Sequence, residues 1–252
     1  MARPFDHIKP HLIRRRPQGR AVRGEVLFLH GAGQGPWCWE AFIDLALQQG
    51  FSANCLELPG HGPQTWELPA ATSLRDYAGL ARRAAAELGR PILVGAGMGG
   101  WLALKVLEQA DLPALLLAPI PAAGLPLPAL AGLLLCRPAM AAALVRGDRR
   151  ARELTSWMPA ESGPVVKEPL RVWAELALGL VRARPRPGRA PRLVVAAGRD
   201  YLLPLASLRR LAHRLRATVI VLPDHFHDLL APDSRGAVAQ VMCDFLAGLK
   251  EY

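Results

Sequence analysis

The chain alternates between two hydrophobic patterns. Short, mostly apolar runs are followed by longer segments in which the apolar positions recur every three or four residues. The first pattern is typical of strands buried on both faces, and the second of amphipathic helices. The alternation predicts an α/β fold, in which a mainly parallel central sheet carries helices on both faces. We expect strands at 25–29, 52–58, 92–94, 114–118, 192–197 and 218–222.

The clearest helix signal follows Ser73. This residue can cap a helix that runs to Leu88, and Asp76 stands three positions later, which approximates a capping box. Gly89 then ends the segment. Further helices are expected at 37–49, 99–110 and 234–249.

Residues 121–190 interrupt the alternation of strands and helices. They contain apolar helical patterns at 127–145 and 172–181, followed by a segment rich in proline and arginine. We therefore predict an α/β core in two parts, 1–120 and 191–252, with a helical cap inserted at 121–190. Because the cap is rich in Leu and Trp, a hydrophobic small-molecule substrate is favoured over a sugar or a phosphate.

Two features bear on membranes. The uncharged stretch 112–136 is long, but five prolines interrupt it, so we interpret it as a strand, a turn and a helix. The first residues contain no apolar segment of the kind found in a signal peptide. We therefore expect no membrane insertion and a cytoplasmic protein.

The charge is strongly positive, since 31 Lys and Arg oppose 21 Asp and Glu for a net +10. No nucleic-acid-binding motif accompanies it, so we expect no nucleic-acid partner and interpret 14–16, three arginines, as a solvated edge. The four cysteines show no C-x-x-C or metal-ligand spacing, and we predict neither a disulfide framework nor a metal site. The sequence does not indicate an oligomeric state.

Candidate functional residues follow the predicted strands. His30-Gly31-Ala32-Gly33 comes after the first, Asp200 after the fifth, and His225 and His227 after the sixth. In parallel sheets, functional groups gather at the carboxyl ends of the strands.

Gly97 follows the third strand, within Gly95-Ala96-Gly97-Met98-Gly99. Strand, glycine-rich turn and helix start form the context of the nucleophile elbow, G-x-S-x-G, in which a serine stands on a sharp turn. Here the middle residue has no hydroxyl. The serines of the chain all lie outside such a motif, and Cys38 is misplaced to act as a substitute.

Together with Leu58-Pro59-Gly60-His61-Gly62, these motifs resemble the α/β-hydrolase family in order and spacing over nearly the whole chain. The resemblance is closest to small esterases and hydroxynitrile-lyase-like members that use no cofactor. It implies that no cofactor is needed here.

The resemblance also implies roles for single residues. Ala32 and Met98 would supply the backbone N–H groups of an oxyanion hole, and Asp200 would be the acid that orients a histidine. Proline commonly follows the catalytic histidine by seven residues, and Pro232 therefore favours His225 as the base. His227 is the alternative base or a pocket residue. The expected substrate-binding residues are His30, Gly31, Gly33, Trp37, Ala96 and His227; for Trp37, helix-to-sheet packing is an equal alternative.

Three functions remain open for a chain with glycine at this position. The first possibility is an esterase-type hydrolase inactivated by an engineered change at Gly97. The second is an enzyme in which the His225/Asp200 dyad acts as a general base without an acyl-enzyme, as in a lyase or cyclase. The third possibility is a non-catalytic ligand-binding member of the family.

Overall fold

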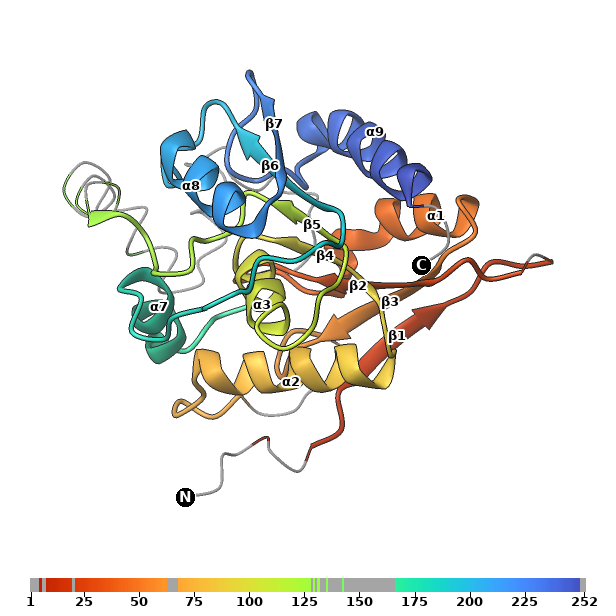
Figure 1. The fold of residues 1–252 in the computed structure, drawn as a ribbon. Helices are drawn as coiled ribbons and strands as arrows, with labels where there is room; N and C mark the ends of the chain where they lie inside the picture. Colours follow the sequence, from red (N-terminus) through yellow and green to blue (C-terminus); the bar gives the residue numbers. More distant parts are fainter. Residues whose placement is uncertain are drawn as a thin grey trace.

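The structure is a computed structural model, and it describes residues 5, 8–19, 21–62, 68–127, 129, 131, 135, 142 and 166–249. Over this part of the chain it forms a seven-stranded sheet in the order β1-β3-β2-β4-β5-β6-β7 (Figure 1). Neighbouring strands are parallel except β1 and β3. The predicted fold class is confirmed. The strands are β1 (His11–Arg15), β2 (Glu25–Leu29), β3 (Ser52–Glu57), β4 (Ile92–Ala96), β5 (Ala114–Leu117), β6 (Arg192–Ala197) and β7 (Thr218–Leu222).

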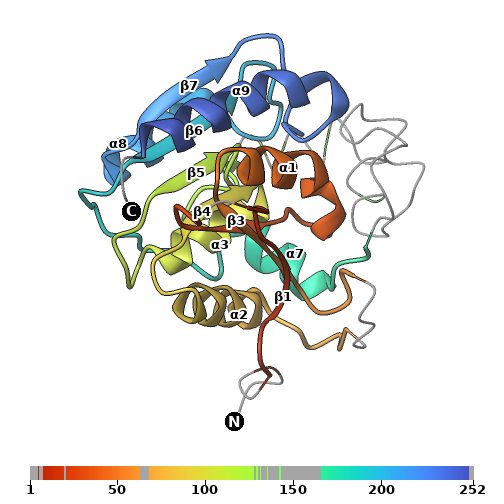
Figure 2. The same cartoon turned by 90° about the vertical axis from the view of Figure 1, so that its right-hand side faces the viewer.

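Helices cover both faces of the sheet. One face carries the 3-10 helix η1 (Pro36–Trp39) with α1 (Glu40–Gln48) and α9 (Pro232–Gly248), which come to the front in Figure 2. The other face carries α2 (Leu74–Glu87), α3 (Met98–Val106) and α8 (Leu205–Leu215). Because both faces are covered, β3, β4, β5 and β6 are buried along their whole length.

The start of α2 confirms the capping box. The Ser73 hydroxyl accepts a hydrogen bond from the Arg75 N–H at 3.0 Å, and the Ser73 N–H donates to Asp76 Oδ2 at 2.8 Å. These contacts satisfy N–H groups that a helix cannot satisfy internally. The helix therefore begins where the sequence predicts.

Two elements were not predicted. β1 pairs antiparallel with β3, His11 opposite Glu57, but its half-exposed residues lack a clear apolar run and include Arg14 and Arg15. Helix α8 follows Pro204 without a side-chain cap. Its buried positions Leu208, Leu211 and Leu215 have helical spacing, but basic residues dilute the pattern.

The insertion between β5 and β6 is described in part. The pattern at 172–181 corresponds to α7 (Leu170–Ala177), which lies against α2. Most of 127–145 lies outside the described residues, so the division into core and cap stays a prediction. In the part of the chain that is described, no helix has both the length and the apolar character to cross a membrane. The predicted location in the cell is untested.

Candidate active site

The turn between β4 and α3 has a backbone conformation that disfavours side chains. Gly97 has φ +53° and ψ −113°, a combination that costs residues with a Cβ about 1–3 kcal/mol. Its N–H donates to the Leu117 carbonyl at 3.0 Å, and its carbonyl accepts from the Ile120 N–H at 3.0 Å. The turn is thus held in place by the chain that follows β5. A Cβ built on Gly97 would have no heavy atom of the described residues within 4 Å.

The start of α3 presses against the end of β2. A Cβ on Gly99 would stand 1.9 Å from the Leu29 carbonyl oxygen and 2.6 Å from that of His30, so only glycine fits. This contact brings the turn at Gly97 and Met98 beside the loop His30–Gly33. The two predicted oxyanion donors, on Ala32 and Met98, therefore belong to adjoining segments. Their role as donors stays a prediction.

Asp200 lies just after β6 and bonds to a histidine. Its Oδ2 is 2.8 Å from Nδ1 of His227, while Oδ1 accepts the N–H groups of Leu202 and Leu203 at 2.8 and 3.0 Å. The carboxylate is 1% exposed and the imidazole 16%. The aspartate is thus oriented by the backbone, and the histidine by the aspartate.

This pairing corrects the choice between the two histidines. His225, the preferred base, directs Nδ1 to the hydroxyl of Ser234 at 2.9 Å, at the start of α9. Its carbonyl accepts the N–H of Arg199, which ties the backbone at 225 to the loop before Asp200. Residues two apart in an extended segment point to the same side, so sequence spacing could not separate the two rings. The partner of Asp200 is His227.

Charges near His227 favour its cationic form. Burial lowers the pKa of this imidazole, but the charge and hydrogen bond of Asp200 and the charge of Asp228 outweigh it, and the pKa is raised. The neighbouring carboxyl of Asp228 is itself perturbed. Burial raises the pKa of Asp228 to about 6, against the effects of the Leu230 N–H, the His227 charge and a hydrogen bond from Gln34.

The surroundings of Cys38 do not favour a nucleophilic role. Burial, followed by the charges of Cys55 and Asp228, raises the pKa of the Cys38 thiol well above its ordinary value. The nucleophilic form of cysteine is the thiolate, and here it is disfavoured.

The residues predicted to bind substrate differ in exposure. His30 is 1% exposed, and its Nδ1 contacts the Gly31 carbonyl oxygen at 3.0 Å; its role in substrate binding stays a prediction. Burial and the charge of His61 lower its pKa to about 3, which keeps it neutral. Gly31, Gly33 and Ala96 are also buried, whereas Trp37 and His227 are half-buried.

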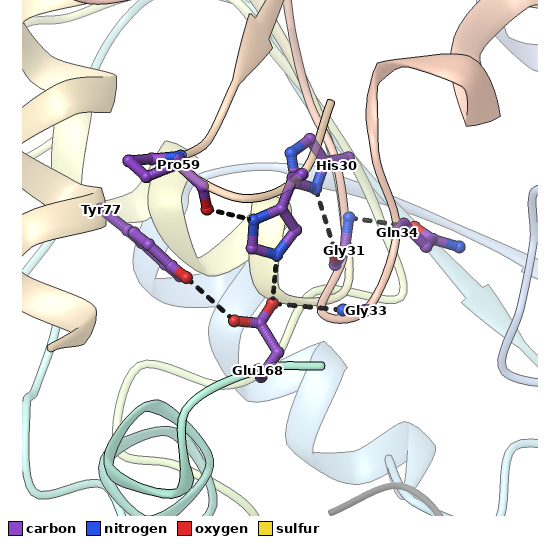
Figure 3. Close-up of polar contacts among 8 residues, drawn as sticks. His30, Gly31, Gly33, Gln34, Pro59, Tyr77 and Glu168 are labelled. Atoms are coloured by element: carbon purple, nitrogen blue, oxygen red, sulfur yellow. Dashed lines mark hydrogen bonds and ion pairs between the residues drawn. The ribbon is translucent and has the colours of Figure 1, made fainter. Parts of the chain in front are cut away.

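A second histidine–carboxylate pair lies beside the loop His30–Gly33, and sequence reasoning missed it. Glu168, just before α7, accepts hydrogen bonds at Oε1 from His61 Nε2 at 2.8 Å and from the Gly33 N–H at 3.2 Å. Its Oε2 accepts the Tyr77 hydroxyl at 3.0 Å (Figure 3). Glu168 is 107 residues from His61 and belongs to no motif, so the chain offers no local signal for the pair.

No cluster of three or more His, Cys, Asp or Glu side chains with the arrangement of a metal site occurs among the described residues.

A family model described as "Alpha/beta hydrolase family" matches residues 26–241, most of the chain. The chain belongs to the alpha/beta hydrolase family. This hydrolase-family protein is 37% identical over 51 residues to methylesterase 18 of Arabidopsis thaliana, but the match spans only 20% of the chain and 19% of that relative.

Solved structures agree with the fold of this alpha/beta hydrolase. A monoacylglycerol lipase of Paleococcus ferrophilus superposes with a TM-score of 0.65 at 21% identity, covering 95% of this chain and 98% of the lipase. A thermophilic esterase of Thermogutta terrifontis gives a TM-score of 0.68 at 18% identity, covering 94% and 93%. At such identities the likeness establishes the shared architecture alone.

Proposed function

We propose that this alpha/beta hydrolase acts on a hydrophobic small-molecule carbonyl substrate through general-base chemistry of the His227–Asp200 pair, without an acyl-enzyme. Gly97 would occupy the position of the nucleophile. The observation that carries the proposal is the 2.8 Å bond between His227 and Asp200, retained in a chain whose elbow has no side chain. The half-buried ring of His227 can be reached by solvent, as a general base requires.

The proposed reaction is the attack of water on an ester-like carbonyl. Asp200 holds Nδ1 of His227, so Nε2 takes the proton from a water bound over Gly97. The water oxygen bonds to the carbonyl carbon, and the carbonyl electron pair moves to the oxygen, which the N–H groups of Ala32 and Met98 would stabilise. Collapse then breaks the bond to the leaving group, which regains the proton from His227.

The same arrangement suits removal of a carbon-bound proton. His227 would accept that proton, and the N–H groups would stabilise the resulting enolate, as a lyase or cyclase requires. Ester hydrolysis is the reading that we carry forward, because the similar proteins of known structure include an esterase and a lipase.

The two histidines provide the first test. We expect slow hydrolysis of p-nitrophenyl butyrate by the parent chain, reduced about a hundredfold or to the buffer rate in His227→Ala, since a positioned base contributes roughly 10²–10⁴-fold. His225→Ala is the matched control and should change the rate by less than about threefold, because its ring bonds to Ser234. Equal rates in the parent and His227→Ala would refute the dyad.

Restoring the serine provides the second test, and it also probes the alternative of an inactivated hydrolase. A Cβ at position 97 meets open space, so Gly97→Ser should fold at a cost of about 1–3 kcal/mol for the positive φ. We expect a rise in esterase rate of about a hundredfold or more and a burst of p-nitrophenol from an acyl-enzyme. A folded serine variant with no gain would show that Gly97 is not the nucleophile position.

The alternative of a non-catalytic binding protein predicts a different outcome. The parent chain would turn over no substrate, while a ligand that occupies the site would raise the melting temperature in proportion to its concentration. His227→Ala would then weaken that thermal shift without any rate to change.

A further inference from the structure

Glu168 connects three segments at the carboxyl edge of the sheet. It contacts Gly33 in the loop after β2, His61 in the loop after β3 and Tyr77 on α2, each through a side-chain oxygen (Figure 3). Its own segment belongs to the insertion and leads into α7. A single carboxylate thus joins the insertion, the core and the loop that carries Ala32.

The carboxylate of Glu168 is fully buried and forms a pair with His61. Both side chains, Glu168 and His61, are 0% exposed. The second ring nitrogen of His61, Nδ1, is 2.8 Å from the Pro59 carbonyl oxygen, so both nitrogens face acceptors and a cationic ring satisfies both. Burial raises the pKa of Glu168, but the His61 charge and the three hydrogen bonds outweigh it and leave the pKa lowered.

The backbone of Gly33 is held at both of its polar groups. Its N–H donates to Glu168, and its carbonyl accepts the N–H of Val166 at 3.0 Å. The residue before it is Ala32, whose N–H is the predicted oxyanion donor. The Gly33 N–H belongs to the peptide plane between Ala32 and Gly33, and the Ala32 N–H belongs to the plane before it. Because consecutive peptide planes share a Cα atom, fixing the later plane limits the orientation of the Ala32 N–H.

We propose that Glu168 is a positioning residue that fixes the loop His30–Gly33, the predicted oxyanion loop, to the part of the insertion that leads into α7, with His61 as its charge partner. The link between the loop and catalysis rests on the proposed function. The fixing of the Gly33 N–H does not, and it can be measured without any substrate.

Glu175 offers a matched control. It is a buried glutamate on the same side of the insertion, 7% exposed, and its carboxylate accepts the Leu74 N–H at 2.7 Å at the start of α2. It pairs with Arg171 and makes none of the contacts that join Glu168 to the loop. Glu168→Gln and Glu175→Gln therefore remove one buried charge each, at two different places.

The first readout is the amide of Gly33. In protein labelled with ¹⁵N-glycine and carbonyl-¹³C-alanine, NMR selects the seven Ala–Gly pairs of the sequence, among which the Ala32–Gly33 resonance is assigned by substitution. We expect Glu168→Gln to move the Gly33 amide resonance and to speed its hydrogen exchange roughly tenfold or more, because a charge-assisted hydrogen bond becomes a neutral one. Glu175→Gln should do neither. If the two variants leave the Gly33 amide equally unchanged, the proposal is overturned.

The second readout separates positioning from general stability. In the Gly97→Ser background, Glu168→Gln should lower kcat for p-nitrophenyl butyrate about ten- to a hundredfold with KM nearly unchanged, since an oxyanion hole acts in the transition state. A rise in KM with unchanged kcat would contradict positioning. If Gly97→Ser gains no activity, position 97 is not the nucleophile position, while the amide measurement still decides the role of Glu168.

A milder change covers the case in which Glu168→Gln does not fold. Tyr77→Phe removes the hydroxyl bond to Oε2 and leaves both contacts of Oε1 in place. It should shift the Gly33 amide in the same direction by a smaller amount. An unchanged amide in this variant would count against the proposal.

Discussion

Among the described residues, two histidine–carboxylate pairs have the same 2.8 Å separation but different surroundings. His61 and Glu168 are 0% exposed, and their remaining polar atoms contact a carbonyl, a backbone N–H and a phenol. His227 is 16% exposed, and only one of its ring nitrogens is directed to Asp200. A short hydrogen bond therefore does not identify a catalytic pair. Exposure of the histidine ring distinguishes the two.

The largest expected effect is on stability, at the buried pair. Glu168→Ala should lower the free energy of unfolding by about 3–5 kcal/mol, because it leaves three buried donors without an acceptor. Asp200→Asn should cost less than about 2 kcal/mol, since the amide oxygen can still accept the Leu202 and Leu203 N–H groups. Urea denaturation at neutral pH measures both. Equal losses would remove the distinction between the pairs.

A smaller loss is expected when the phenol is removed. Tyr77→Phe deletes one hydrogen bond to a buried carboxylate and should lower the free energy of unfolding by about 1.5–3 kcal/mol. A change below about 0.5 kcal/mol would mean that the Glu168 charge is stabilised by His61 and Gly33 alone.

The pH dependence should separate the pairs further. The raised pKa of His227 contributes stability that is fully present below its ordinary value near 6.5 and is lost as pH rises through the raised value. The lowered pKa of Glu168 contributes stability present above its ordinary value near 4.5 and lost as pH falls through the lowered one. Denaturation of Asp200→Asn and Glu168→Gln across this range should show opposite trends relative to the parent; parallel trends would contradict the assignment.

The rate of ester hydrolysis should also depend on the protonation of His227. Because His227 must be neutral to accept a proton, hydrolysis should increase as pH rises through its raised pKa. Asp200→Asn removes the largest favourable influence on the cation, so the profile should move to lower pH. A profile that does not move would indicate that another group limits the rate.

The smallest effect is expected at His225. His225→Gln removes a contact with Ser234 and should change the free energy of unfolding by about 1 kcal/mol or less, with little effect on the rate. Thermal unfolding and the ester assay measure the two quantities. A large loss of rate would return His225 to consideration as the base.

The sequence predicted six strands and the elbow because these depend on local patterns. Apolar runs identify β2 to β7, and glycines at fixed spacing identify the turn at Gly97. The charged β1 was missed because it is stabilised by pairing with β3, a contact between distant segments. The partner of Asp200 was assigned wrongly for a similar reason. The path of the loop after β7, and not the sequence spacing to Pro232, decides which histidine ring reaches Asp200. The contacts of Glu168 could not be predicted from the sequence because its three partners come from other elements.

The conformation of Gly97 has a consequence for redesign. The turn keeps the sharp geometry of an elbow, but glycine adopts it without the strain that a side chain would add. Glycine at this position therefore avoids about 1–3 kcal/mol of backbone strain that a serine would carry. Since none of the described residues occupies the space around a Cβ at this position, a cysteine or an aspartate introduced there would project into the same volume. Position 97 is thus a site at which different nucleophilic residues can be introduced and compared on one unchanged scaffold.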